Sequence, residues 1–376
     1  MIPLFRSAVA PGAAELVADV VHSGRFGHGP RVEEFERALA ERVGHPRLVA
    51  LNNGTSALHL ALHLALRPAG GPEWDGPPGE VLTTPFTFEA TNWSILANGL
   101  RITWVDVDPA TLNMDLDDLA KKISPATRAV MVVHWGGCPV DLDRLRRILD
   151  DAEAAYGVRP AVIEDCAQAW GAVCHGRPLG NHGNHCAYSF HATKHLSCGT
   201  GGMLVLPDEP SLERARRLRF FGIDRDADRV NADYDVPEWG YNFYLNEIGA
   251  AIGLANLADV DARVERHRRN AAFYDRELAG VPGLEPTART PGLESSFWLY
   301  PVKVEDRAAF MRKMTAAGIT VSVVCRRNDA HGCVTAARTA LPGLDAVHER
   351  VVNIPVGWWL SDEEREHIVA TVRSGW

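Results

Sequence analysis

The feature that most constrains the fold is a regular alternation of short apolar runs with helical patterns between about residues 47 and 206. Helical spacing of apolar residues predicts helices at Ser56–Leu66, Ala90–Ala97, Leu116–Ile123 and Leu142–Ala155. Short strands that are apolar on both faces and alternate with helices predict a mostly parallel sheet covered by helices, in the α/β class. The predicted strands are Leu48–Leu51, Val81–Thr84, Ile102–Val107, Ala129–Val133, Ala161–Ile163, Ala187–Phe190 and Met203–Leu206.

The remainder of the chain predicts an unequal division into two domains. Apolar periodicity indicates a helix at Arg31–Val43 and one long helical stretch over about Leu245–Leu278. We expect a large domain over residues 1–260, including the N-terminal helical segment, and a small α+β domain over residues 261–376. Pro68–Gly79 is rich in proline and glycine and predicts an exposed loop. The small domain's expected elements are strands at Phe297–Val304 and Thr320–Val324 and helices at Arg307–Ala317 and Asp362–Val372, the last beginning at the capping-box pair Ser361 and Glu364.

Composition excludes several classes of protein. The 376 residues carry a formal net charge of −9, which argues against a general nucleic-acid or anionic-membrane binder. No apolar run has the length of a membrane span, and the start of the chain predicts no signal peptide. The seven cysteines are scattered without a Cys-x-x-Cys pair, so we expect reduced thiols and a cytoplasmic location.

Small residues between the first predicted strand and its helix form a candidate phosphate site. In the segment Asn53-Gly54-Thr55-Ser56-Ala57-Leu58, backbone N–H groups at a helix N-terminus would favour a bound phosphate. An ordinary N-cap by Thr55 or Ser56 needs the same residue types, and taken alone the segment favours that simpler reading.

Two acidic residues end the predicted strand within Val162–Gln168. Ligands of parallel sheets usually bind beyond the carboxyl ends of the strands, so Glu164 or Asp165 can point into the ligand crevice. A carboxylate there could hold a protonated ring nitrogen, a metal or a ribose. A helix N-cap is equally compatible with this segment.

Lys194 follows the next predicted strand, in the segment Tyr188–His195, and precedes the glycine-rich segment Gly199–Gly202. Glycines let the chain approach a ligand closely. A lysine shielded from water has a lowered pKa and can form a Schiff base. An isolated lysine is far more commonly an ordinary solvated residue.

Residues of the types that bind zinc crowd the same region. Their spacing matches no tetrahedral pattern such as Cys-x₂-Cys with His-x₃-His, so we expect no metal and place the histidines near a site or on its rim. These residues are Cys174, His175, His182, His185, Cys186, His191, His195 and Cys198.

Taken in order, these segments resemble the DegT/DnrJ/EryC1/StrS family of pyridoxal-phosphate (PLP) sugar aminotransferases, within the fold-type I aminotransferase superfamily. Gly240–Glu247 alone would indicate only packing and capping before a helix, but it fits the family's GYN motif. The resemblance runs over nearly the whole chain and implies PLP as cofactor. The residues that carry it are Ser23–Gly27 with Gly29-Pro30, NGTSAL, TPFTFEAT, VDVDPATLNMD, VVHWGGCPVDLD, VIEDCAQAWGA, YSFHATKHL, GYNFYLNEIGAAIGLANL and VNIPVGWW.

The resemblance assigns roles to the cofactor side of the site. Lys194 would hold PLP as an internal aldimine and then carry a proton between the substrate Cα and the cofactor C4′. Asp165 would pair with the pyridinium nitrogen, so that the ring acts as an electron sink. Gln168 would neighbour the phenolic oxygen, and Phe88 would stack on the ring. The phosphate would be held by Gly54, Thr55, Ser56 and Ser189, and by Asn242 of the neighbouring subunit, which implies a homodimer with shared active sites.

On the acceptor side we expect Phe26, Arg327, Asn328 and His331 near the substrate, and Arg219, Arg225 and Arg229 could meet acceptor phosphates. Cys166 is expected near the cofactor because it follows Asp165. Gly199-Thr200-Gly201-Gly202 departs from the Gly-Glu-Gly-Gly common in the family. Some relatives replace the Schiff-base lysine by histidine and perform dehydration, so Lys194 favours transamination.

The implied activity is transfer of an amino group from an amino acid, with L-glutamate the expected donor, to a keto group of a nucleotide-linked deoxysugar in ping-pong half-reactions. A keto-cyclitol or another secondary-metabolite ketone stays open as the acceptor. A non-catalytic ligand-sensing protein on the same fold and a zinc hydrolase are more distant alternatives. The expected partners are small molecules and a second copy of the chain, with no nucleic acid and no membrane.

Overall fold

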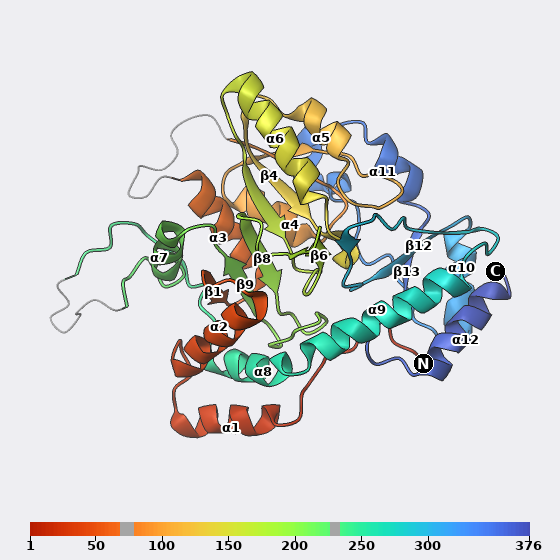
Figure 1. The fold of residues 1–376 in the computed structure, drawn as a ribbon, viewed down its shortest axis with the longest axis horizontal. Coiled ribbons are helices and arrows are strands. Elements are labelled where there is room, and N and C mark those ends of the chain that lie inside the picture. Colours follow the sequence, from red (N-terminus) through yellow and green to blue (C-terminus); the bar gives the residue numbers. More distant parts are fainter. Residues whose placement is uncertain (68–78, 226–233) are drawn as a thin grey trace.

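A seven-stranded sheet forms the centre of the computed structural model, which describes residues 1–67, 79–225 and 234–376 (Figure 1). The strands follow the order β1-β9-β8-β5-β4-β2-β3. All neighbours from β8 to β3 are parallel, whereas β9 runs antiparallel to both β8 and β1, so the prediction of a mostly parallel sheet is confirmed. The strands are β1 (Leu48–Leu51), β2 (Glu80–Thr83), β3 (Arg101–Trp104), β4 (Thr127–Val133), β5 (Ala161–Asp165), β8 (His185–Ser189) and β9 (Gly202–Val205).

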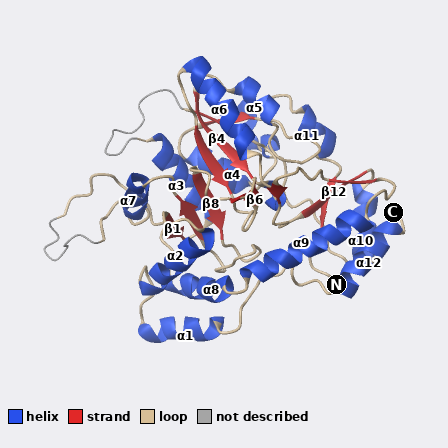
Figure 2. Cartoon of the chain, in the orientation of Figure 1, coloured by secondary structure: helices blue, strands red, loops and turns tan. Residues whose placement is uncertain are grey.

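Helices cover both faces of this sheet, as Figure 2 shows. Because side chains alternate along a strand, Leu48 and Ala50 of β1 join one buried apolar cluster, and Val49 and Leu51 join the other. The first cluster includes α2 (Pro30–Val43), α5 (Leu116–Lys122), α6 (Leu142–Tyr156) and α8 (Glu247–Leu257). The second includes α3 (Gly54–Leu66), α4 (Glu89–Ala97) and α7 (Glu209–Leu218). Helix α1 (Ala13–Ser23) lies along α8.

A second, antiparallel sheet lies in the C-terminal part of the chain, in the order β10-β12-β13. Its buried cluster contains Tyr274, Phe310 and Ile368, and also Ile2 from the N-terminal end of the chain. Its elements are α9 (Val260–Glu277), β10 (Leu284–Pro286), β12 (Tyr300–Val304), α10 (Arg307–Ala316), β13 (Val351–Ile354) and α12 (Asp362–Arg373). The other elements are η1 (Trp135–Gly137), β6 (Val173–Cys174), β7 (Arg177–Pro178), β11 (Leu293–Glu294), η2 (Asn328–Ala330), η3 (Gly332–Ala337) and α11 (Pro342–Val347).

The domain boundary between residues 260 and 261 stays a prediction. Helix α9 crosses it: Val260 and Val264 pack in a cluster of the central sheet, whereas Ala271 and Tyr274 pack in the C-terminal cluster. One helix therefore connects the two cores, and Figure 1 shows α9 running between them.

Two predicted elements are wrong in detail. The long helical stretch is two helices, α8 and α9, because Asp259 leaves the helical conformation with ψ of 2°. Apolar periodicity could not reveal this break, because both helices keep a buried face. The segment 320–324 makes only an isolated bridge from Ser322 to Asn353, and Val324 has a positive φ of 66° that interrupts a strand.

The capping box at Ser361 and Glu364 is present and begins α12, as predicted. Most of the predicted loop Pro68–Gly79 lies outside the described residues. Within the described ranges, no helix combines the length and the apolar character that a membrane crossing requires.

Candidate active site

The candidate active site lies at the carboxyl ends of β5 and β8. These strands are parallel neighbours with Asp165 opposite Ala187, so both end at the same edge of the sheet. Strand β5 ends in Asp165 and β8 ends in Ser189, and Lys194 follows on the loop after β8. The structure thus brings the predicted acid and the predicted lysine to one sheet edge.

Asp165 is held in one orientation by hydrogen bonds. It is 4 % exposed. The Thr91 hydroxyl donates to Oδ2 over 2.6 Å, and the Ala167 N–H donates to Oδ1 over 3.0 Å. Since the single hydroxyl proton of Thr91 goes to Asp165, Thr87 must donate in the 2.9 Å contact between the two threonines. Burial raises the pKa of Asp165, while Thr91, the Ala167 N–H and Lys194 oppose that rise.

Lys194 has the environment of a reactive amine. Its backbone N–H donates to the His191 carbonyl over 2.9 Å, which fixes a tight turn. Burial lowers the pKa of Lys194 to about 8, against the opposing attraction of Asp165 and Cys325. A lysine with this pKa has a substantial neutral fraction near physiological pH, as a nucleophile requires.

Helix α3 begins at the same edge of the sheet. Asn53, rather than Thr55 or Ser56, is the N-cap, and its side chain accepts the Ser56 N–H over 2.7 Å. A Cβ added to Gly54 would lie 2.9 Å from the Cβ of Ser189, so only glycine lets the first turn of α3 lie so close to the end of β8. The phosphate residues predicted from two distant segments are therefore in contact.

Gln168 and Phe88 flank this edge. The Gln168 Oε1 accepts the Gly136 N–H over 2.7 Å, so the amide nitrogen is the group that this side chain can offer to a ligand. Phe88 stands immediately before α4 and is 60 % exposed. Lysine, carboxylate, helix N-terminus and an exposed aromatic ring together fit the groups of PLP, although contacts with Gln168 and Phe88 stay predictions.

Asn242 is exposed, and its carbonyl accepts a hydrogen bond from the Asn52 side chain over 3.2 Å. It therefore lies next to the N-cap of α3 within its own chain. Its predicted reach to the phosphate site of a neighbouring subunit stays a prediction.

Two of the predicted acceptor-side residues have side chains that are already bonded to other residues of the chain, and two are more accessible. Arg327 donates to both carboxylate oxygens of Asp329, over 2.8 and 2.7 Å, and also bonds to Asp345. Asn328 is fully buried behind the 85–88 segment, donating to the Thr87 carbonyl over 3.0 Å and accepting from Asn92 over 2.7 Å.

His331 and Phe26 are the more accessible members of this group. The His331 Nε2 lies 3.3 Å from a carboxylate oxygen of Glu89, the residue after Phe88. Phe26 is 48 % exposed, and its carbonyl accepts the Glu247 N–H at the start of α8 over 3.2 Å.

Two of the predicted phosphate-binding arginines, Arg219 and Arg225, line the same surface pocket, together with His28 and Glu36. Arg219 is only 6 % exposed, forms an ion pair with Glu36 and donates to the Ala50 carbonyl over 3.0 Å, so it is committed within the chain. Arg225 is exposed and donates to the His28 carbonyl over 3.0 Å. Arg229 lies outside the described residues.

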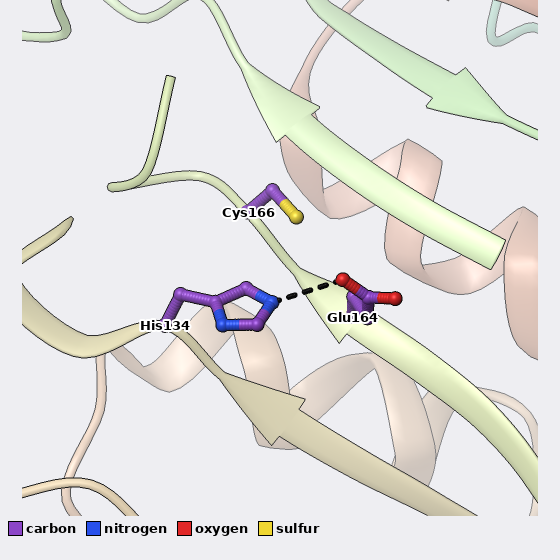
Figure 3. A group of neighbouring side chains, drawn as sticks. All are labelled: His134, Glu164 and Cys166. Carbon is purple, nitrogen blue, oxygen red and sulfur yellow. Dashed lines mark hydrogen bonds and ion pairs between the residues drawn. The ribbon is translucent and has the colours of Figure 1, made fainter. Parts of the chain in front are cut away.

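A cluster of three side chains lies at the end of β5 and is called the brace below. It consists of His134, Glu164 and Cys166 (Figure 3). His134 Nδ1 accepts the Val140 N–H over 3.0 Å, so the ring is neutral and Nε2–H donates to Glu164 over 3.0 Å. The His134 backbone N–H also donates to the Asp165 carbonyl over 3.2 Å. The Cys166 thiol lies within 4.8 Å of the ligand atoms of His134 and Glu164, and its expected place near the cofactor stays a prediction.

These brace residues are also one of two groups, in the described part of the chain, whose metal-ligating atoms lie close together. The other comprises Asp141, Cys174 and His175. The histidines and cysteines that crowd the sequence do not gather at one point, since His195 instead bonds to the Ser296 carbonyl and packs on His267. Hydrogen bonds already engage both ring nitrogens of His134, as expected of a structural brace.

Sequence reasoning missed two residues that touch the central pair. Thr91 contacts Asp165 and also Thr87, and the pair of threonines four residues apart in the TPFTFEAT motif could have indicated that their side chains lie close together. Trp298 contacts Lys194, with the ammonium nitrogen 3.4 Å from the ring centroid. That contact joins residues far apart in the chain and leaves no local signal.

Comparison with known proteins agrees with this arrangement. The sequence model of the DegT/DnrJ/EryC1/StrS aminotransferase family, which is PLP-dependent, matches residues 10–373. The chain is 61 % identical to the sugar aminotransferase CalS13 from Micromonospora echinospora, with a TM-score of 0.96 and 100 % of each chain covered. It is 32 % identical over 377 residues to a dTDP-4-dehydro-2,3,6-trideoxy-D-glucose 4-aminotransferase from Saccharopolyspora spinosa, covering 97 % of this chain and 94 % of that one.

The PLP form of Spr1654 from Streptococcus pneumoniae is 26 % identical to this chain, with a TM-score of 0.88 and coverage of 99 % and 98 %. These similarities extend over both cores and over every segment that forms the site. The chain therefore belongs to the DegT/DnrJ/EryC1/StrS aminotransferase family and is an aminotransferase.

Proposed function

We propose that this enzyme transfers an amino group from L-glutamate to a keto group of a nucleotide-linked deoxysugar, in two half-reactions that use PLP. The observation that carries the proposal is the pair at the sheet edge: Lys194, with its pKa lowered to about 8, interacts with buried Asp165. A neutral amine and a fixed carboxylate are the two groups that a pyridine aldehyde cofactor needs from its protein.

When bound, PLP supplies an aldehyde that condenses with amines and a ring that withdraws electrons from the adjacent carbon. Asp165 would keep a proton on the ring nitrogen, and Thr91 would hold the carboxylate in place for that bond. Lys194 would remove a proton from the donor Cα and deliver it to the cofactor carbon C4′. The N–H groups at the start of α3, with Ser189, would hold the phosphate.

The names of two relatives support the proposed acceptor class. The Saccharopolyspora spinosa enzyme, by its name, aminates carbon 4 of a dTDP-linked keto-deoxysugar, and CalS13 is named a sugar aminotransferase. We extend this acceptor class to the present chain. We also propose a homodimer in which Asn242 of one subunit completes the phosphate site of the other.

A substrate panel tests the acceptor. The enzyme is first converted to its amino form with L-glutamate and freed of the donor, and keto compounds are then added singly. We expect nucleotide-linked keto-deoxysugars to restore the original visible spectrum in a single half-reaction. Conversion of a nucleotide-free cyclitol ketone, with nucleotide sugars inert, would overturn the acceptor assignment. If no ketone reacts although PLP binds, the ligand-sensing alternative takes its place.

A further inference from the structure

The indole ring of Trp298 packs against the amine of Lys194. The Lys194 nitrogen lies 3.4 Å from the centroid of the indole, within the distance of a cation–π contact. Trp298 is 7 % exposed, so this contact is largely shielded from water, where such contacts are strongest. The indole thus meets the reactive amine face-on and not through a polar group.

The indole is fixed in position from two sides. Its Nε1–H donates to the Thr193 carbonyl over 2.9 Å, which joins the ring to the residue that precedes Lys194. Phe5, from the N-terminal segment, stacks on the indole with centroids 5.1 Å apart and planes inclined by 22°. The hydrogen bond to the loop that carries Lys194 and the stacking on Phe5 together keep the indole next to the amine.

We propose that Trp298 is a positioning residue that holds the free, protonated amine of Lys194 beside Asp165 whenever the lysine is not attached to the cofactor. The inference rests on the proposed role of Lys194. Burial disfavours the ammonium form and lowers the pKa of Lys194, whereas the aromatic face attracts the ammonium. The indole therefore partly offsets the effect of burial on this pKa. The ammonium is then held in place after the amine has taken the proton and until it returns it.

The test measures the protonation of Lys194 in the full-length chain freed of cofactor. Acetic anhydride acylates neutral amines, and peptide mass spectrometry gives the labelling of Lys194 at each pH. Trp298→Leu removes the aromatic face but keeps an apolar side chain. We expect the labelling midpoint to fall by about 1 pH unit, equivalent to roughly tenfold faster labelling at a fixed pH below the midpoint.

A purely space-filling role for Trp298 predicts the opposite sign. Water entering beside a smaller side chain would raise the midpoint toward the ordinary value for lysine, and a rise or an unchanged midpoint would overturn the proposal. Trp298→Phe keeps a weaker aromatic face and should give a smaller fall, which preserves the test if the leucine variant does not fold. Trp376→Leu is the matched control, because Trp376 packs on Phe310 of the C-terminal core and should leave the midpoint unchanged.

This readout is independent of the acceptor. A chain that fails the substrate panel but shows the fall in midpoint would leave the role of Trp298 standing. A chain that passes the panel without the fall would remove that role and leave the proposed function intact.

Discussion

The two sides of the proposed active site are built differently. The proposed cofactor side consists of strand ends and a helix start, and its polar groups are held by the backbone or by short side chains, as Asp165 is by Thr91 and Ala167. The proposed acceptor side consists of loops, and its cation Arg327 is already paired with Asp329 and Asp345. A charged residue near a site is therefore not necessarily available to a substrate.

The largest effect on the reaction rate should come from a substitution on the cofactor side of the site. Asp165→Asn removes the charge that would keep the cofactor nitrogen protonated, and we expect the rate of the glutamate half-reaction to fall by about 100- to 1,000-fold. Stopped-flow spectroscopy of the loaded enzyme measures this rate. A fall of less than about fivefold would contradict the role of Asp165.

The hydrogen bond from Thr91 should contribute less than the charge itself. Thr91→Val removes a bond to a charged group, and we expect about a tenfold fall in the same rate. Because Thr91 opposes the raised pKa of Asp165, its loss raises that pKa further. The acid limb of the pH–rate profile should therefore move to higher pH.

Thr111→Val is the matched control for Thr91, since Thr111 donates to Asp108 over 2.9 Å in a comparable Thr–Asp bond outside the site. It should leave both the rate and the pH profile unchanged. Equal effects of the two variants would show that Thr91 acts only on stability.

The smallest effects should come from a substitution in the loop that contains Asn328, and the quantity compared there is the free energy of unfolding. Asn328→Ala leaves one side-chain N–H of Asn92 and the Thr87 carbonyl without the partner that Asn328 provides, and we expect a loss of about 1–3 kcal/mol in the free energy of unfolding. Arg350→Ala, outside this loop, breaks a largely exposed ion pair with Glu285 and should cost about 0–1 kcal/mol. Urea unfolding of both variants measures the difference, and an equal or larger loss for Arg350→Ala would contradict the structural role of Asn328.

The same contrast explains what the sequence could and could not predict. Asp165 and Lys194 follow buried strands that are apolar on both faces, so the parallel-strand rule places them at one edge without further information. The burial of Asn328 was not predictable, because Asn328 is polar and its partners lie in the distant 84–92 segment. The contact between Trp298 and Lys194 is equally long-range.

Within the fold, alternating apolar runs predicted the parallel strands well, but they did not predict the direction of β9 or the short strand β13. Strand direction depends on the connection and not on the residues of the strand itself. The break between α8 and α9 was hidden because both helices bury an apolar face, in each of two cores.

The central claim is that Lys194 carries the cofactor, and borohydride trapping tests it most directly. The purified enzyme is incubated with PLP, reduced with sodium borohydride, digested and analysed by mass spectrometry, with Lys194→Ala treated in parallel. We expect the reduced pyridoxyl mass on the peptide containing Lys194, none on that peptide in the variant, and protection from trapping when L-glutamate is added first. A pyridoxyl group found only on other lysines, or a variant labelled as fully as the wild type, would contradict the assignment.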